Sequence, residues 1–315
     1  MKYNKFIINP NDSGQRLDKY LTKAMPALPF SMLYKAIRTK DVKVNKKRTA
    51  QDYRLCEGDI VEIYLKEDFS KKDEYDFKKL TPKLDIVYED TNILLTNKPQ
   101  GMSVHPDSVQ TTGTLIDNIK AYLFQKGEYI PENETSFAPS LCNRIDRNTV
   151  GIVICAKNAA ALREVNSMIK ESQVKKKYKL ICHGILQKKT GKLTNFLEKK
   201  RDENIVRVLP SPTKSTVSAI TKYSVIRENN SLGLSYCEAE LLTGRTHQIR
   251  AQFAHMGHPL LGDGKYGINR KDVKMGFKYQ ALCSYSLEFL PEGGSVLEYL
   301  RGKVFSIVPP FEDFI

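Results

Sequence analysis

The stretch CNRIDRNTVGIVIC, residues 142–155, joins a charged loop to an apolar run. Residues 151–155 form a short uninterrupted apolar segment, which predicts a buried strand. Just before it, Asp146 stands between Arg144 and Arg147, and neighbouring positive charge keeps a carboxylate ionised. A loop at the end of a strand presents such an anion to a substrate while the sheet holds it in place. Taken alone, an R-x-D-R loop is more often a surface ion-pair cluster than a catalytic site.

The residues around this stretch predict one α+β domain built around a sheet. Alternating or continuous apolar runs indicate strands at 86–88, 93–95, 178–182 and 234–241, the first two as a hairpin. A helix is expected from about Ala159 to Glu171, since its apolar residues recur at helical spacing. Strands are therefore expected on both sides of Asp146 in the chain, and the helix follows it.

A second polar segment, LTGRTHQIR at residues 242–250, follows a strand and enters a helix that ends near residues 255–257. Its helical spacing places apolar side chains on one face and turns Thr246, His247 and Arg250 toward phosphate or another polar surface. Arg245 lies at the turn into the helix, where its planar guanidinium can pair with a buried carboxylate. The segment is therefore a second candidate for the functional site.

The first 66 residues form a separate basic module. They carry 14 Lys and Arg against 7 Asp and Glu, and the predicted order is helix, helix, strand, turn, strand. Residues 11–65 resemble a small RNA-binding module first described in a ribosomal small-subunit protein, on the pattern RLDxxL followed by VxVN and GD. We expect three parts: an RNA-binding domain over 1–66, a polar linker over 67–80 and a catalytic domain over 81–315.

The composition favours a polyanionic partner. Lys and Arg outnumber Asp and Glu by 50 to 36 in 315 residues, and 41% hydrophobic residues suffice for a sizeable core. Many ordinary proteins are also basic, so charge alone leaves RNA binding undecided. The six cysteines contain no CxxC pair, no run of 18 apolar residues occurs, and residues 1–14 lack the apolar region of a secretory leader, so we expect none. We expect a cytoplasmic protein with reduced cysteines and no membrane partner.

Four ordered motifs carry a family resemblance. Residues 97–106 (NKPQGMSVHP), the two polar segments above and residues 257–267 (GHPLLGDGKYG) together resemble the RluA family of pseudouridine synthases, over about residues 84–311. With the N-terminal module, the arrangement is similar to family members that modify large-subunit ribosomal RNA. The resemblance implies a mixed, mainly antiparallel central sheet with flanking helices. It also implies isomerisation of uridine to pseudouridine in structured RNA.

The resemblance assigns roles to residues of this sequence. Asp146 matches the nucleophile, Tyr178 of Lys176-Lys177-Tyr178 matches the residue that stacks on the target base, and Arg245 matches the partner of the aspartate. Arg144 fits the position that fills the gap left by the flipped base. Further contacts to substrate or RNA are expected from Arg147, Thr149, His247, Gln248, Arg250 and, as an apolar wall, Leu282.

This sequence departs from the family pattern at five positions. The usual histidine before R-L-D is Asn143, the leucine is Ile145 and the serine of T-S-G is Val150, while a later L-H-A is Leu282-Cys283-Ser284. None of these changes removes the nucleophile. Because the imidazole is lost at Asn143 and Cys283, no RNA contact is assigned to either.

The reaction needs few groups, because the glycosidic bond is broken and the base rejoins through carbon with no atom added or removed. A carboxylate that attacks the sugar or abstracts its proton, a flat side chain that holds the base and a dry pocket suffice. A base inside a helix is out of reach, so the enzyme must flip it out or select a loop. We therefore expect no cofactor and no metal, an RNA partner and a monomer.

Two other interpretations remain open from the sequence. His247, His255 and His258 have a spacing loosely like that of a metal site, although no carboxylate or cysteine stands at a matching helical offset. Alternatively, the chain is a non-catalytic RNA-binding or ribosome-assembly protein in which the basic module does the binding. Asp146, Tyr178 and Arg245 argue for the enzyme.

Overall fold

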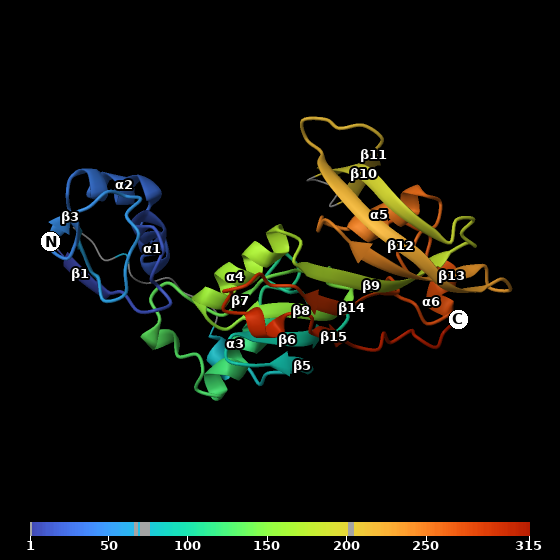
Figure 1. The fold of residues 1–315 in the computed structure, drawn as a ribbon, viewed down its shortest axis with the longest axis horizontal. Coiled ribbons are helices and arrows are strands. Elements are labelled where there is room, and N and C mark those ends of the chain that lie inside the picture. Colours follow the sequence, from blue (N-terminus) through green and yellow to red (C-terminus); the bar gives the residue numbers. More distant parts are fainter. Residues whose placement is uncertain (1, 66–68, 70–75, 201–204) are drawn as a thin grey trace.

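The computed structural model describes residues 2–65, 69, 76–200 and 205–315. It contains a small sheet near the N-terminus and a much larger one that occupies the rest of the chain (Figure 1). Among the described helices, none is long and apolar enough to cross a bilayer. The predicted mixed α+β fold with a mainly antiparallel sheet is confirmed.

The N-terminal part has the predicted order of two helices followed by strands. The elements are β1 (Lys2–Ile7), α1 (Leu17–Ala24), α2 (Phe30–Arg38), β2 (Val42–Val44), β3 (Lys47–Arg48) and β4 (Ile60–Leu65), with the sheet order β1-β4-β2-β3. Strand β1 was not predicted. Asn45 and Lys46 adopt positive φ angles of 51° and 65°, which is the backbone that a tight two-residue hairpin turn requires. The two helices and the sheet enclose their own apolar core, which includes Leu17, Leu21 and Ile63.

The large sheet is antiparallel apart from one pair of strands. Its main path is β11-β10-β12-β13-β9-β14-β8-β6-β5, while β15 pairs with β14 and β7 pairs with β8. The strands are β5 (Ile86–Glu89), β6 (Ile93–Lys98), β7 (Ser140–Leu141), β8 (Val150–Ala156), β9 (Val174–His183), β10 (Thr190–Lys200), β11 (Ile205–Leu209), β12 (Val217–Asn229), β13 (Leu234–Leu241), β14 (Leu282–Phe289) and β15 (Val304–Ser306). The helices are α3 (Leu115–Gln125), α4 (Ala159–Lys170), α5 (Gln248–His255) and α6 (Arg270–Lys274), with short 3-10 turns η1 (Phe77–Lys79), η2 (Pro131–Asn133) and η3 (Glu298–Leu300).

Strand β8 is buried on both faces, as its uninterrupted apolar sequence predicts. Successive side chains of a strand point to opposite faces, so Val153 and Cys155 join the core on the side of α3 and α5. Ile152 and Ile154 join the core under α4 on the other side. The loop that carries Asp146 thus continues into a strand that is buried along nearly its whole length.

Gly151 allows two backbones to meet directly beside that loop. β8 and β14 are the parallel pair, with Gly151 opposite Ser284. A Cβ atom at Gly151 would lie 2.4 Å from the backbone oxygen of Ser284, and the φ angle of +130° is one that side-chain-bearing residues rarely adopt. Only glycine fits this crossing, and the crossing fixes where the loop leaves the sheet.

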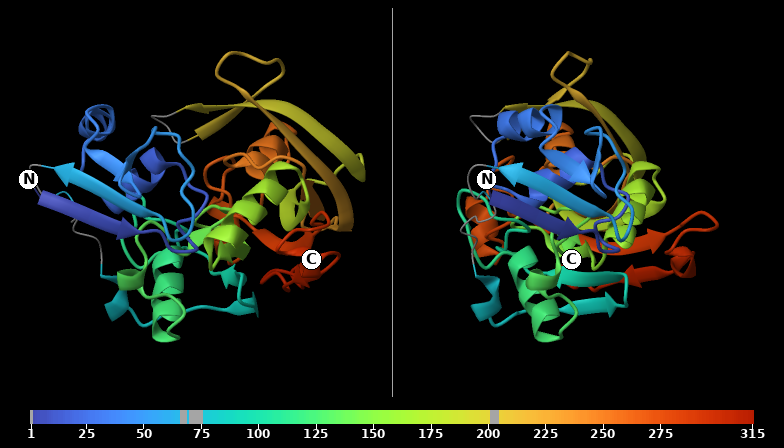
Figure 2. Two further views of the ribbon diagram at one scale, coloured as in Figure 1. Left: turned by 60° about the vertical axis from the view of Figure 1, so that its left-hand side comes forward. Right: turned by 90° about the vertical axis from the view of Figure 1, so that its left-hand side faces the viewer.

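The N-terminal part contacts the start of α4 and the loop after η2 (Figure 2). Asn11 donates to Glu134 at 2.7 Å and accepts a hydrogen bond from the backbone of Ala159 at 3.1 Å. Asp12 is fully buried and accepts a hydrogen bond from the hydroxyl of Ser136 at 2.5 Å. Polar contacts therefore join the small sheet to the large domain at these positions.

Most of the predicted linker, residues 67–80, lies outside the described residues. Within it, η1 (Phe77–Lys79) packs on α3, because the Phe77 ring contacts those of Phe124 and Tyr129 at centroid distances of 6.4 and 6.0 Å. Residues 77–79 were predicted to belong to the linker, but they pack against the large domain.

Candidate active site

Asp146 lies in the loop between β7 and β8, where local hydrogen bonds define the backbone. The amide of Thr149 donates to the Asp146 carbonyl at 3.0 Å and closes a turn. Ile145 is buried in the core, and the Asn143 side chain accepts a hydrogen bond from the backbone of Ile154 at 2.8 Å. The Asp146 side chain is 25% exposed, so its carboxylate remains accessible. Asn143 thus contributes to the loop through an amide in place of the usual imidazole.

A buried arginine holds the Asp146 carboxylate. Arg250 in α5 donates from Nη1 to Oδ2 of Asp146 at 2.8 Å. Its Nε and Nη2 make a two-pronged pair with the buried Asp263, at 2.7 and 2.8 Å. Burial opposes the charge of the guanidinium, but the two carboxylates outweigh it and raise the pKa of Arg250. The arginine is therefore a fixed positive charge locked by Asp263 and directed at Asp146.

This geometry corrects the predicted partner of Asp146. Arg245 is exposed and donates its Nε to the carbonyl of Ser218 at 3.1 Å, so it does not pair with the aspartate. Both arginines stand in the same polar segment, but Arg245 precedes α5 and Arg250 lies inside it, on the face that looks toward Asp146. Arg250 was expected to face phosphate and is instead buried between two carboxylates.

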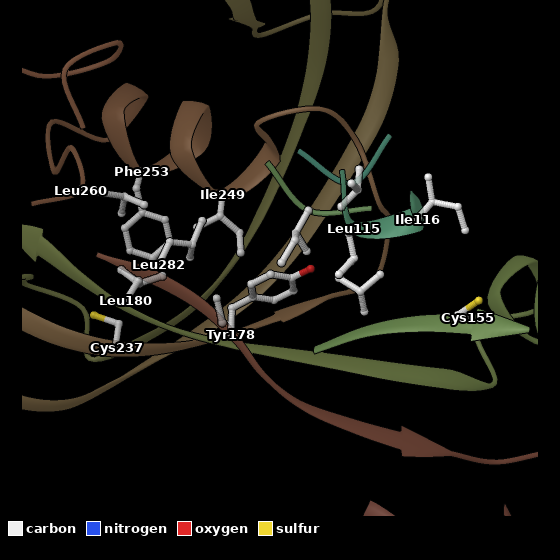
Figure 3. Packing of buried hydrophobic residues seen from close by; sticks show 14 of the residues in the cluster. Leu115, Ile116, Cys155, Tyr178, Leu180, Cys237, Ile249, Phe253, Leu260 and Leu282 are labelled. Atoms are coloured by element: carbon white, nitrogen blue, oxygen red, sulfur yellow. The ribbon is translucent and has the colours of Figure 1, made fainter. Parts of the chain in front are cut away.

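A pocket of about 280 Å³ opens next to Asp146. The sheet side contributes Tyr178 from β9 and Leu282 from β14, both buried. Tyr178 lies among apolar side chains that include Ile249 and Leu282 (Figure 3). Burial raises the pKa of Tyr178 to about 12, so the phenol is neutral at physiological pH. Of the ten predicted site residues, all except Arg147 line this pocket: Arg144, Asp146, Thr149, Tyr178, Arg245, His247, Gln248, Arg250 and Leu282.

A second, more polar pocket of about 470 Å³ meets the first at Asp146. Among its charged lining residues, the basic ones outnumber Asp107 and Asp146: Arg144, Arg147, Lys199, Lys265 and Arg250. Arg147 is held there by Asp107 at 3.1 Å and by the hydroxyl of Ser103 at 3.1 Å. The carboxylate therefore lies between a mainly apolar slot and a basic chamber.

Two predicted RNA-contacting residues have other partners in the structure. The Gln248 amide accepts from Thr243 and from the backbone of Arg245, and it donates to Ile220 and Thr221. All its donors and acceptors are used, so Gln248 positions the turn before α5. Thr149 is buried, and its hydroxyl accepts a hydrogen bond from Gln280 at 3.2 Å. We therefore interpret both as supports of the site.

Lys98 was not among the predicted site residues, and it is completely buried beside the Asp146 loop. Its ammonium donates to the carbonyls of Pro99, Met102 and Arg147 at 2.8, 2.9 and 2.8 Å. Burial lowers the pKa of Lys98 to about 7, against the opposing effect of Asp146. Three carbonyl partners match the three protons of an ammonium group, so we favour the charged form. Its position in the NKPQG motif is the sequence feature that could have identified Lys98 as part of the site.

His247 begins α5 in a left-handed conformation, with φ of 52°. Its Nδ1 lies 2.9 Å from the hydroxyl of Tyr266, and its Nε2 lies 3.8 Å from Oδ2 of Asp146. Burial lowers the pKa of His247 to about 4, so the ring is neutral at physiological pH. His258, another of the histidines considered as metal ligands, contacts the carbonyl of His183 at 2.8 Å. Across the described residues, no three His, Cys, Asp or Glu side chains are grouped to hold a metal.

Two family models match this chain: RNA pseudouridylate synthase over residues 92–255 and the S4 domain over residues 15–61. Ribosomal large subunit pseudouridine synthase C of Buchnera aphidicola is 34% identical over 284 residues, which cover 86% of this chain and 83% of that protein. An uncharacterized RNA pseudouridine synthase of Mycoplasma capricolum is 33% identical, with 95% and 96% covered. The structure of human RNA pseudouridylate synthase domain containing 1 aligns with a TM-score of 0.57 at 20% identity, covering 76% of this chain and 87% of that one, and supports the fold alone.

Proposed function

Because this chain belongs to the RNA pseudouridylate synthase family, we propose that Asp146 is the group with which it isomerises uridine in structured RNA. The chain is a pseudouridine synthase with an N-terminal S4 domain, so a role as an RNA-binding protein without catalysis is not favoured. The observation that carries the proposal is the Asp146 carboxylate, held by Arg250 at 2.8 Å beside the pocket that contains Tyr178.

Asp146 supplies the charge that the reaction needs. In our proposal the target uridine leaves the RNA stack and enters the smaller pocket, and the carboxylate attacks the sugar or removes its proton. The glycosidic bond breaks, the uracil turns, and its C5 bonds to the sugar, displacing the carboxylate where that group has attacked. The proton at C5 is then released and N1 takes up a proton, so the composition of the nucleotide is unchanged and the chain's own residues suffice. Arg250 keeps the carboxylate in one place throughout.

The walls of the pocket hold the base while it is detached. Tyr178 offers a flat neutral ring, and Leu282 and Ile249 add apolar surface that excludes water. Stacking on an aromatic ring contributes roughly 1–3 kcal/mol per base and tolerates rotation of the base about the stacking axis. We propose that this tolerance is what lets the uracil turn without leaving the site.

The basic chamber takes the RNA backbone on either side of the target. Arg147 and Lys199 line it and can neutralise phosphates, and Arg144 is placed at the junction of the two pockets. We propose that Arg144 fills the gap left by the flipped base. Backbone contacts of this kind orient the RNA without reading its sequence.

We propose large-subunit ribosomal RNA as the substrate, because several relatives are named ribosomal large subunit pseudouridine synthase C. The protein then acts in the cytoplasm, as a monomer, without metal or cofactor. The division into 1–66, 67–80 and 81–315 remains our proposal for its domains.

Mapping pseudouridine across total RNA from cells with and without this protein tests the proposal. We expect pseudouridine to disappear at a few uridines of large-subunit ribosomal RNA and to return when the protein is restored. Loss confined to another RNA would show that the substrate is wrong. An unchanged map would contradict the proposed activity in the cell.

A further inference from the structure

We infer that His247 is a positioning residue for Asp146, and that Tyr266 fixes it in the tautomer with the proton on Nε2. The inference rests on the proposed role of Asp146 and adds a group to its site. Three contacts carry it: a hydrogen bond from Val206 to Tyr266, a second between Tyr266 and His247, and the approach of His247 to the carboxylate.

The direction of the first two bonds follows from counting protons. The backbone N–H of Val206 in β11 donates to the Tyr266 hydroxyl at 2.9 Å, so the oxygen is the acceptor there. The same hydroxyl lies 2.9 Å from Nδ1 of His247, and no other acceptor for its proton is found in the described part of the chain. The hydroxyl therefore donates to Nδ1, and a neutral imidazole that accepts at Nδ1 carries its proton on Nε2.

The protonated nitrogen faces the carboxylate. Nε2 of His247 lies 3.8 Å from Oδ2 of Asp146, and Nη1 of Arg250 lies 2.8 Å from the same oxygen. Two donors thus approach Oδ2, and in our proposal Oδ1 is the oxygen that meets the nucleotide. The 3.8 Å separation exceeds a hydrogen bond, and we expect it to shorten when RNA fills the pocket, as catalytic contacts commonly do.

The surroundings hold the ring in this orientation. His247 is the left-handed residue at the start of α5, a strained backbone position that is common at functional sites. The rings of His247 and Tyr266 meet edge to face at a centroid distance of 5.6 Å. The Arg250 guanidinium lies 5.3 Å from the Tyr266 ring. Tyr266 therefore contacts both groups that approach Oδ2.

A neutral donor has a chemical advantage here. A second cation beside Arg250 would stabilise the negative charge of the carboxylate further and weaken it as a nucleophile. The low pKa of His247, about 4, keeps the ring uncharged at physiological pH. The imidazole then orients Asp146 through its N–H while leaving the charge on the oxygen.

Two substitutions of His247 separate this role from a structural one. Glutamine can place an N–H near the position of Nε2, whereas asparagine places it near Nδ1 and tolerates the left-handed backbone better. With unmodified large-subunit ribosomal RNA transcripts, we expect His247→Asn to lower kcat about 100-fold and His247→Gln less than about 10-fold, with KM little changed. Equal losses in the two variants, or a change confined to KM, would overturn the inference.

Tyr266→Phe tests whether the hydroxyl acts through the histidine. We expect it to lower kcat about 10-fold in the wild-type background and to have no further effect in His247→Asn, because residues that act through one another are not additive. The same loss in both backgrounds would contradict the coupling.

A measurement without RNA separates this inference from the proposed function. The ¹⁵N chemical shifts of His247 in the full-length protein report which ring nitrogen carries the proton. We expect protonated Nε2 in the wild type and a mixture of tautomers in Tyr266→Phe. Protonated Nδ1 in the wild type would overturn the inference even if the enzyme is active. A wild type that forms no pseudouridine would instead refute the proposed function.

Discussion

Asp146 is part of an ion-pair network of three residues. Arg250 joins it to Asp263, and both contacts are 2.8 Å or shorter. Asp263 is buried and has no other cation of comparable geometry in the described part of the chain. Removing Arg250 therefore leaves a carboxylate unpaired inside the protein, which affects stability as well as chemistry.

Arg250→Met and Arg245→Met distinguish the two arginines. We expect the Arg250 variant to lose about 3–5 kcal/mol of unfolding free energy, since it strands a buried charge, and to lose activity. The exposed Arg245 should change the unfolding free energy by less than about 1 kcal/mol. Urea unfolding of both variants measures the difference. A comparable loss of stability in the two would show that Arg245 carries more of the structure than its single bond to Ser218 suggests.

The depressed pKa of His247 predicts a dependence of stability on pH. Above about pH 6.5 the ring is neutral in both the folded and the unfolded chain, and the full stability is present. As pH falls toward 4, the unfolded chain takes up a proton that the folded site resists, so up to about 3 kcal/mol is lost.

His247→Asn should flatten this part of the stability curve, because asparagine does not titrate. The unfolding free energy of the wild type and variant between pH 7 and 4 provides the test. Parallel curves would mean that His247 is not held neutral in the folded protein.

At the scale of single residues, most residues predicted from the sequence line one pocket, but their hydrogen-bond partners were not predicted. Asp146, Tyr178 and Leu282 meet in one pocket as expected. The choice between Arg245 and Arg250 depends on the start and rotation of α5, which the pattern of residues does not determine. Lys98 was missed because its partners are backbone carbonyls. Every residue has such a carbonyl, so the sequence does not show which ones accept hydrogen bonds from a lysine.

At the scale of elements, β8 and its crossing with β14 place the loop that carries Asp146. We expect Gly151→Ala to destabilise the protein by about 3 kcal/mol or more, since the added methyl group meets the Ser284 backbone and the φ angle is unfavourable. Gly276→Ala is a matched control, because it also has a positive φ of 94° but has open space around it. Its expected loss is about 1 kcal/mol.

Thermal unfolding of both glycine variants isolates the steric part of the effect. If Gly151→Ala is no less stable than Gly276→Ala, the β8 and β14 backbones are not in the close contact described above.

The elements that the sequence predicted share strong local signals. The predicted hairpin is present as β5 and β6, which have apolar residues in each strand and turn residues between the strands. The predicted helix is present as α4, whose apolar residues recur at helical spacing. The long strands β10 and β12 were not predicted, because most residues of β10 are polar and the apolar residues of β12 do not follow a strict alternation. They pair with each other and continue the sheet, so their stability comes from tertiary pairing that local periodicity does not report.

At the scale of the molecule, we propose that two parts of the chain contact RNA. Helix α2 carries exposed Lys35 and Arg38, which with Tyr34 line a shallow groove of about 460 Å³ on the small domain. The basic chamber beside Asp146 is the second part. Contacts of Asn11 and Asp12 with the large domain tie the small domain to the body that carries the active site.

The double variant Lys35→Ala/Arg38→Ala should bind RNA more weakly and with a shallower salt dependence. Each lost phosphate contact lowers the slope of log affinity against log salt concentration by about 1. We expect turnover at saturating RNA to fall far less than affinity. Filter binding across a salt series, followed by single-turnover kinetics, measures both. An unchanged slope would exclude this face of α2 from the RNA interface.

The most direct test of the whole account is Asp146→Asn, assayed for pseudouridine in large-subunit ribosomal RNA transcripts by chemical derivatisation. Asparagine preserves the shape of the side chain and can still face Arg250, but it carries no charge with which to attack or accept a proton. We predict no detectable pseudouridine, with RNA affinity and the unfolding transition close to wild type. Pseudouridine formation at the wild-type rate would contradict the assignment of Asp146 as the reactive group.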